Sequence, residues 1–255
     1  MDLGFNETND ALSVRIRAHL KFSSMKIEDR LDHFLDGEKP ARIADIGCGS
    51  GNYTETLAKN ACFYLGLDKS AELLGQARIR ARELGYKHVG FMQWDMNQKF
   101  CFVPETFDFI FFGYSAYYTN NPAQLISSTK DMLDKKGTLC MVGPMRGNAV
   151  ELDTITAQLL GKASTEEKEA RVLRLEQEFA PLMTKAFANV QVEHRDYSLQ
   201  FPNKQEYLRY YLATPQYVEF AQRRGAPPLQ RVEEIIEKVP GLKVTKKAVF
   251  LWAKY

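Results

Sequence analysis

Residues 41 to 145 alternate short apolar runs with longer amphipathic stretches, and this alternation leaves few folds open to the chain. The apolar runs predict β-strands at 41–46, 62–67, 88–94, 107–112 and 137–143. The stretches between them predict helices at 51–60, 70–85 and 122–134. Strands that alternate with helices are typical of a parallel sheet.

The run FDFIFF at 107–112 is apolar at nearly every position. A strand with one face in water would alternate, so a continuous run indicates burial on both faces, with helices on each side of the sheet. We therefore predict an α/β fold with a doubly wound, mostly parallel sheet of seven strands and helical lid elements.

The pattern changes after residue 145. We expect helices at 148–161, 165–188 and 203–238, the last broken at Pro215 and at Pro227 and Pro228, and closing strands at 190–200 and 246–254. Residues 9–36 form another helical stretch. The predicted division is an N-terminal helical cap at 1–40, an α/β core at 41–200 and 240–255, and a helical lid insertion at 201–239.

Charge and composition exclude several classes of protein. The 34 Lys and Arg and 32 Asp and Glu leave a net charge of +2 and are interspersed, which gives little support to nucleic-acid binding. No signal-peptide run opens the chain and no window approaches the roughly 18 apolar residues of a membrane span, so we expect a cytoplasmic protein without a membrane partner. The cysteines form no CxxC pair and read mostly as small core residues: Cys48, Cys62, Cys101 and Cys140.

The segment IADIGCGSGNY, residues 43–53, is the most informative part of the sequence. An apolar strand runs through Asp45 into Gly47, Gly49 and Gly51 and then into a predicted helix. Glycines at alternate positions let the backbone turn sharply and approach a ligand closely. The turn also directs the amides of the helix N-terminus into the same space.

Two acidic residues stand at the ends of the next predicted strands. Asp68 follows Gly47 by 21 residues, close to the roughly 20 that separate a glycine turn from a ribose-binding carboxylate. Asp95 ends the third strand, where a carboxylate can accept from an exocyclic adenine amine and Met96 can contact the ring. The neighbouring residues Lys69 and Gly113 complete the predicted cofactor set.

These residues together resemble the class I S-adenosylmethionine-dependent methyltransferases, most closely the small-molecule branches known as types 11 and 25. The resemblance covers about residues 41 to 145 and rests on Asp45 with the GxGxG turn, on Asp68, on Asp95 and on the run LDKKGTLCMVGP. It implies a Rossmann-like methyltransferase fold with S-adenosylmethionine as cofactor. The glycine turn would hold the methionine moiety, Asp68 the ribose, and Asp95 with Met96 the adenine.

A dinucleotide-dependent dehydrogenase is the main competing interpretation, since it also combines a glycine-rich turn with a later carboxylate. Here the third glycine comes two positions after the second, where the dinucleotide motif requires three, and an acidic residue precedes the turn. Both features match the methyltransferase pattern better.

The end of the fourth strand, GYSAYY at 113–118, should face the methyl group. It lacks the Pro-Pro-aromatic motif of family members that methylate amino groups of bases or amides, and the Pro-Cys of the cytosine C5 branch. Tyr117 and Tyr118 before Asn121 and Pro122 match many small-molecule members. Tyr118, and after it Tyr114, are therefore candidate residues of the acceptor pocket, with core packing as the alternative.

The four histidines are the obvious candidates for a general base. His33 and His88 read as bystanders. His19 lies one helical turn after Arg15 and faces either the cleft or solvent. His194 lies in the predicted strand 190–200 and points either to solvent or to the lid. His19 and His194 join the candidate catalytic residues.

We therefore predict methyl transfer to the oxygen or nitrogen of a small molecule. The tyrosines of the segment 201–220 indicate an aromatic or apolar acceptor, unless they are lid core. No pattern of metal ligands is present in the sequence, so we predict a metal-independent enzyme. A methyltransferase for tRNA or another macromolecule, and a regulatory protein that binds the cofactor without turnover, are the alternatives. The sequence allows a homodimer.

Overall fold

The computed structural model describes residues 9–99, 102–161 and 166–255. Cys101, residues 1–8 of the predicted cap and residue 165 of a predicted helix lie outside the described residues. The described strands are β1 (Arg42–Ile46), β2 (Phe63–Asp68), β3 (Val89–Gln93), β4 (Phe107–Gly113), β5 (Leu133–Pro144), β6 (Asn189–Gln200) and β7 (Lys243–Lys254).

These strands form one seven-stranded sheet in the order β3-β2-β1-β4-β5-β7-β6. The pairs from β3 to β5 are parallel, and β7 runs antiparallel to both β5 and β6. The strand order reverses between β1 and β4, which places a crevice at their carboxyl ends. The prediction of a doubly wound, mostly parallel sheet of seven strands is confirmed.

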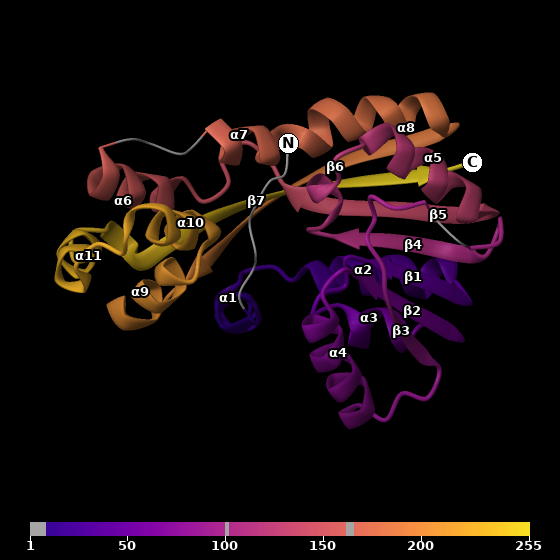
Figure 1. Cartoon of the computed structure of the whole chain (residues 1–255), viewed down its shortest axis with the longest axis horizontal. Helices are drawn as coiled ribbons and strands as arrows, with labels where there is room; N and C mark the ends of the chain where they lie inside the picture. Colours follow the sequence, from indigo (N-terminus) through magenta and orange to yellow (C-terminus); the bar gives the residue numbers. More distant parts are fainter. Residues whose placement is uncertain (1–8, 100–101, 162–165) are drawn as a thin grey trace.

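Helices cover both faces of the sheet (Figure 1). One face carries α2 (Ile27–Glu38), α3 (Thr54–Ala58) and α4 (Ala71–Glu83). The other carries α5 (Pro122–Met132), the π-helical segment η2 (Leu175–Phe179) and α8 (Ala180–Ala186), with α7 (Glu166–Arg174) leading into η2. The expected parallel sheet between two helical layers is therefore present.

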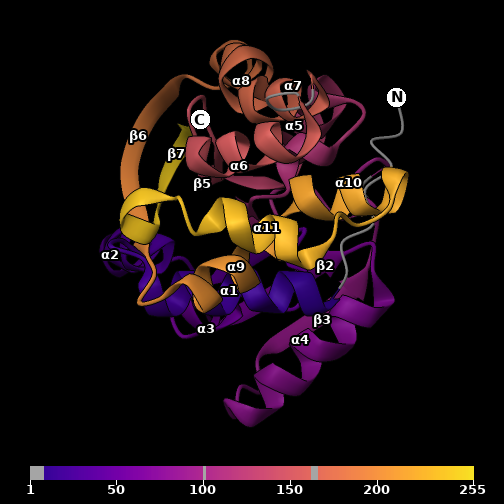
Figure 2. The same cartoon turned by 90° about the vertical axis from the view of Figure 1, so that its left-hand side faces the viewer.

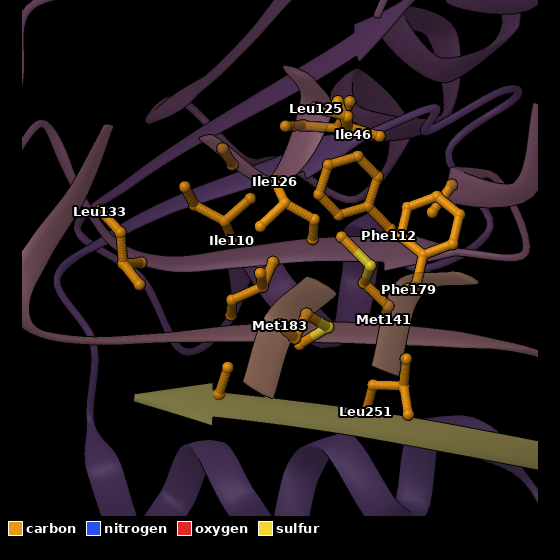
Figure 3. Close-up of a cluster of buried hydrophobic side chains, with 14 of the residues drawn as sticks. Ile46, Ile110, Phe112, Leu125, Ile126, Leu133, Met141, Phe179, Met183 and Leu251 are labelled. Atoms are coloured by element: carbon orange, nitrogen blue, oxygen red, sulfur yellow. The ribbon is translucent and has the colours of Figure 1, made fainter. Parts of the chain in front are cut away.

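The apolar run of β4 is buried on both faces, as its sequence predicts. Phe109 and Phe111 belong to the core under α2 and α3. Ile110 and Phe112 point to the opposite core, where Phe112 lies near Phe179 of η2 (Figure 3). Full burial of each such side chain stabilises the fold by about 1.5–3 kcal/mol, so β4 forms the centre of both cores.

A separate group of helices lies beyond the carboxyl ends of the parallel strands (Figures 1 and 2). It consists of α1 (Asn9–Phe22), α6 (Val150–Leu160), α9 (Lys204–Leu212), α10 (Pro215–Arg224) and α11 (Leu229–Ile236). We call this group the helical cover. Its own core contains Tyr207, Tyr211 and Val232 together with Leu152 of α6, although the predicted division counts α6 with the sheet.

The structure differs from the sequence prediction at several element boundaries. The stretch 9–36 is two helices, because the chain between them bonds to β6: Ser24 N donates to Ser198 O at 2.9 Å. The helix expected at 122–134 ends at Met132, and β5 and β7 begin earlier than predicted. Cys62 is exposed, whereas Cys48 and Cys140 are buried. Within the described residues, no helix is long and apolar enough to span a membrane.

Candidate active site

A tight turn follows β1 and carries the three glycines of the motif. Gly47, Gly49 and Gly51 have φ angles of 76°, 55° and 78°, in the left-handed region that favours glycine. A Cβ on Gly47 would lie 2.3 Å from the Cβ of Ser115. The Ser115 hydroxyl donates to the carbonyl of Ile46 at 2.6 Å. The turn is therefore held against the end of β4, an approach that only glycine permits.

Asp68 ends β2 directly beside this turn. Its Oδ2 accepts a hydrogen bond from Gly49 N at 2.9 Å, and its Oδ1 accepts one from Ser70 N at 2.8 Å. Ser70 is also the N-cap of α4, since its hydroxyl accepts from Leu73 N. Two backbone groups thus fix the orientation of the carboxylate, and its remaining lone pairs can accept from ribose hydroxyls.

Asp95 and Met96 follow β3 at the same edge of the sheet. Asp95 Oδ1 accepts from the backbone N and from the side-chain Nδ2 of Asn97, both at 2.9 Å. The Cε of Met96 lies 3.5 Å from the position that a Cβ on Gly47 would take. A carboxylate and a thioether therefore stand together next to the turn, in an arrangement that suits the polar edge and the face of an adenine ring.

The three strand ends open into one cavity of about 650 Å³, within the roughly 300–1,000 Å³ of small-molecule sites. A Cβ on Gly49 would meet no protein atom closer than 4.0 Å and would take up space on the cavity wall. The residues present therefore leave a cradle that fits an adenosyl cofactor. The predicted cofactor residues that line the cavity are Gly47, Gly49, Asp68, Lys69, Asp95, Met96 and Gly113.

The cavity continues under the helical cover. There it is lined by aromatic, cationic and imidazole side chains from α1, from the segment after β4, and from β6, α9 and β7. The main ones are Arg15, His19, Tyr114, Tyr118, Tyr197, Tyr210 and Lys246. We call the first part of the cavity the cofactor half and this part the acceptor half.

A family model described as a methyltransferase domain matches residues 38–210 of the chain. The chain belongs to this family. The match includes the glycine turn and the strand ends that carry Asp68 and Asp95. S-adenosylmethionine is the cofactor expected for a methyltransferase with this class I fold.

Known proteins resemble this chain over half of their length or more. A ubiquinone biosynthesis O-methyltransferase of Actinobacillus pleuropneumoniae is 31% identical over 117 residues, which are 43% of this chain and 50% of that protein. The chain therefore matches about half the length of this curated relative. The YcgJ protein of Bacillus subtilis has a TM-score of 0.56 at 17% identity, and the alignment covers 89% of this chain and 98% of that one. A SAM-dependent methyltransferase of Aquifex aeolicus has a TM-score of 0.54 at 17% identity, covering 74% and 92%.

Two predicted cofactor residues, Asp45 and Gly51, do not line the cavity. Asp45 is fully buried and accepts from the Tyr64 hydroxyl at 2.9 Å. Burial raises the pKa of Asp45 to about 7, and the nearby Asp68 carboxylate adds to this. A Cβ on Gly51 would lie 2.8 Å from Thr54 Oγ1. Both residues support the turn from behind, so the structure corrects their predicted contact with the cofactor.

The end of β4 contributes two tyrosines to the acceptor half. Tyr114 has a left-handed φ of 56°, its N donates to Val142 O at 2.8 Å, and its hydroxyl lies 3.2 Å from that of Tyr197. Tyr118 lies beside Arg171, whose guanidinium carbon is 5.9 Å from the ring centroid. Both candidates from the sequence therefore lie on the cavity wall.

His19 faces the acceptor half from α1. Its ring centroid lies 6.3 Å from that of Tyr197 and 6.2 Å from that of Tyr210. Burial lowers the pKa of His19 well below its usual range, and the positive charges of Lys246 and Arg15 lower it further. The imidazole is therefore neutral at physiological pH. Of the two orientations left open by the sequence, the structure selects the cleft.

His194 lies elsewhere. It is exposed on β6, and its Nε2 is 3.0 Å from Glu176 Oε1. It does not line the cavity, because strand alternation turns it away from Tyr197, which does. The structure corrects its place among the candidate catalytic residues. Within the described residues, no group of three or more His, Cys, Asp or Glu side chains is arranged to hold a metal ion.

Sequence reasoning missed Lys246, Tyr197 and the ion pair between Arg171 and Glu219. Lys246 and Tyr197 are directly opposite each other in the β6–β7 register. Arg171 Nη2 lies 3.1 Å from Glu219 Oε1 and joins α7 to α10 at the cavity. No motif marks these residues, since each comes from a segment whose place depends on distant packing.

Proposed function

We propose that this protein transfers the methyl group of S-adenosylmethionine to an oxygen or nitrogen atom of a small molecule. The observation that carries the proposal is the continuous cavity, which joins the glycine turn and two strand-end carboxylates to a pocket under the helical cover. A pocket covered by α1, α9 and α10 favours an acceptor small enough to be enclosed.

The cofactor, when bound, supplies a methyl group already activated as a sulfonium. The protein then has to hold two molecules in line and exclude water, and such positioning contributes roughly 7–11 kcal/mol to lowering a barrier. The backbone of Gly47 and Gly49, with Asp68 and Asp95, would bind the cofactor. Tyr114 and Tyr118 would orient the acceptor beside it.

His19 is the group best suited to accept a proton from the acceptor. Its imidazole is neutral, lines the acceptor half, and forms no side-chain hydrogen bond within the described residues. A neutral imidazole can act as a general base when the attacking oxygen or nitrogen must lose a proton. His19→Gln would then lower turnover and remove the acid limb of the pH–rate profile, where protonation of the base abolishes activity, while binding of S-adenosylhomocysteine is retained.

The decisive experiment incubates the protein with extracts and methyl-labelled S-adenosylmethionine and finds the labelled metabolite by mass spectrometry. Calorimetry with S-adenosylhomocysteine and with a nicotinamide dinucleotide tests the cofactor separately. Binding of the nicotinamide dinucleotide without any binding of S-adenosylhomocysteine would overturn the proposal. Label appearing only in RNA would favour the macromolecular alternative, and cofactor binding without any labelled product would favour a regulatory protein. The cytoplasmic location and the homodimer stay predictions.

A further inference from the structure

Positively charged side chains gather in the acceptor half, where α1 and β7 line it. Arg15 and His19 are one turn apart on α1, and Lys246 comes from the start of β7. All three line the same cavity. Arg15 and Lys246 each lower the pKa of His19, and Arg15 lowers that of Lys246, which shows that the three groups lie within electrostatic reach of one another.

The charge of Lys246 is poorly compensated by the protein. Burial lowers the pKa of its ammonium, and within the described residues it forms neither an ion pair nor a hydrogen bond. The carboxylate that acts on it is Glu151, which already accepts from the backbone N and hydroxyl of Thr245. Lys246 is half-buried, and a cation that is partly removed from water without a partner is costly, so such a group indicates a ligand that supplies the missing charge.

Hydroxyl donors surround the same point. Tyr210 is 2% exposed and lines the cavity, yet its hydroxyl has no hydrogen-bond partner within the described residues. Tyr197 stands opposite Lys246 on the neighbouring strand. Burial raises the pKa of Tyr197, and it raises that of Tyr210 to about 12. Both phenols are therefore protonated at physiological pH and can donate to an acceptor atom.

Within the described residues, none of the acidic side chains that line the cavity pairs with Lys246. Glu219 is paired with Arg171, and Asp68, Asp95 and Glu72 in the first turn of α4 belong to the cofactor half. Glu28 also lines the cavity, and burial raises the pKa of its carboxyl. The acceptor half thus presents cations and hydrogen-bond donors to whatever enters it.

We propose that the methyl acceptor carries an oxyanion, a carboxylate or a phosphate, which binds between Arg15 and Lys246 and accepts from the hydroxyls of Tyr197 and Tyr210. This inference rests on the proposed function and adds the chemical class of the acceptor. The anionic group anchors the molecule at the far end of the acceptor half, and the nucleophilic atom then points back toward the cofactor half. Tyr118 and Tyr114 contact the body of the molecule between the two ends.

The test uses matched pairs of small probes on the full chain saturated with S-adenosylhomocysteine. Benzoate is compared with benzamide, and phenyl phosphate with phenol, by titration calorimetry. We expect the anionic member of at least one pair to bind about tenfold tighter than the neutral one, as for a charge-assisted hydrogen bond in a desolvated site. Whichever anion binds better distinguishes the carboxylate from the phosphate.

Substitutions in the cavity then test where the anion binds. Arg15→Gln and Lys246→Gln should each weaken binding of the preferred anion about tenfold, with affinity for S-adenosylhomocysteine unchanged. Arg17→Gln on α1 and Lys243→Gln on β7 are matched controls, because both side chains are exposed and neither lines the cavity. Their anion binding should equal that of the wild type.

The outcomes separate the two proposals. Two results would overturn the oxyanion site alone. In the first, the protein binds S-adenosylhomocysteine but binds neither anion more tightly than its neutral counterpart. In the second, the anion still binds with wild-type affinity to both Arg15→Gln and Lys246→Gln. Absence of S-adenosylhomocysteine binding by the wild-type protein would overturn the proposed function and this inference with it. Retained cofactor-product affinity in the variants shows that they are folded.

Discussion

The two halves of the cavity are built in different ways. The cofactor half comes from the ends of β1, β2 and β3, which follow one another in the chain, and its shape depends on backbone: glycine φ angles, and amides that donate to Asp68. The acceptor half is assembled from side chains of α1, β6, α9 and β7, together with the segment after β4. A general cofactor is bound by a local motif, whereas the acceptor pocket depends on distant segments.

The largest effect is expected where the backbone of the cofactor half is disturbed. Gly47→Ala places a Cβ 2.3 Å from Ser115 Cβ and forces a side chain into a left-handed φ of 76°. Overpacking and strain together should lower the free energy of unfolding by about 3–5 kcal/mol and abolish binding of S-adenosylhomocysteine. Chemical denaturation and calorimetry measure the two effects.

Gly75→Ala provides the matched control. A Cβ on Gly75, within α4, would meet nothing within 4 Å. Alanine there should stabilise the protein by about 1 kcal/mol through its helix propensity. Equal stability of both variants would contradict the view that the turn depends on the contact with β4.

The second effect concerns Asp45, which supports the cofactor half from behind. Its pKa is about 7 in the folded protein, against a usual 3.8. Between pH 3.8 and pH 7 the unfolded chain releases the Asp45 proton and the folded chain keeps it. The stability that protonated Asp45 contributes is therefore fully present below pH 3.8 and is lost as pH rises through 7. From pH 5 to pH 8 the wild type should lose about 3 kcal/mol of stability by this route.

Asp45→Asn should remove that loss, so the stability of the variant relative to wild type should rise with pH. Denaturant titrations at pH 5, 6, 7 and 8 test the trend. Parallel curves for the two proteins would show that Asp45 is ionised throughout and that its burial is offset in some other way.

Asp68→Ala tests the cofactor half at the carboxylate that accepts from the amides of Gly49 and Ser70. Loss of charge-assisted hydrogen bonds to ribose should weaken S-adenosylhomocysteine binding by about 2 kcal/mol. Glu83→Gln, on an exposed residue at the end of α4, serves as the control. Binding of the benzoate or phenyl phosphate probe, measured without cofactor, should be unaffected, which separates the halves. Unchanged cofactor affinity would remove Asp68 from the site.

The smallest effect is expected at the ion pair that joins α7 to the helical cover. Arg171 and Glu219 have side chains only 12% and 13% exposed, so a double-mutant cycle with Gln at each position should give a coupling of about 1 kcal/mol. The pair Arg231 and Glu234, 57% and 48% exposed, should give less than about 0.5 kcal/mol. Similar coupling energies for the two pairs would show that burial does not strengthen the ion pair between Arg171 and Glu219.

Prediction from sequence succeeded where the signal was local. The continuous run of β4 requires cover on both faces, and the structure has this cover. The glycine turn, Asp68 and Asp95 were expected at adjacent strand ends, and there they line one cavity. The predicted places of Asp45 and His194 at the site were wrong, because the direction in which a strand side chain points depends on how the strand packs in the sheet. The break between α1 and α2 was also missed, since a bond to β6 causes it.

The sequence by itself determined the order of strands and helices, the doubly wound sheet and the cofactor turn, because each follows from burial or backbone geometry over a few residues. Only the tertiary structure decided that His19 faces the cavity and that Lys246 stands opposite Tyr197. These residues are far apart in the chain, and their meeting depends on how the helical cover and the antiparallel pair β6–β7 pack at the sheet edge. The acceptor half is therefore a property of packing, while the cofactor half is a property of the motif.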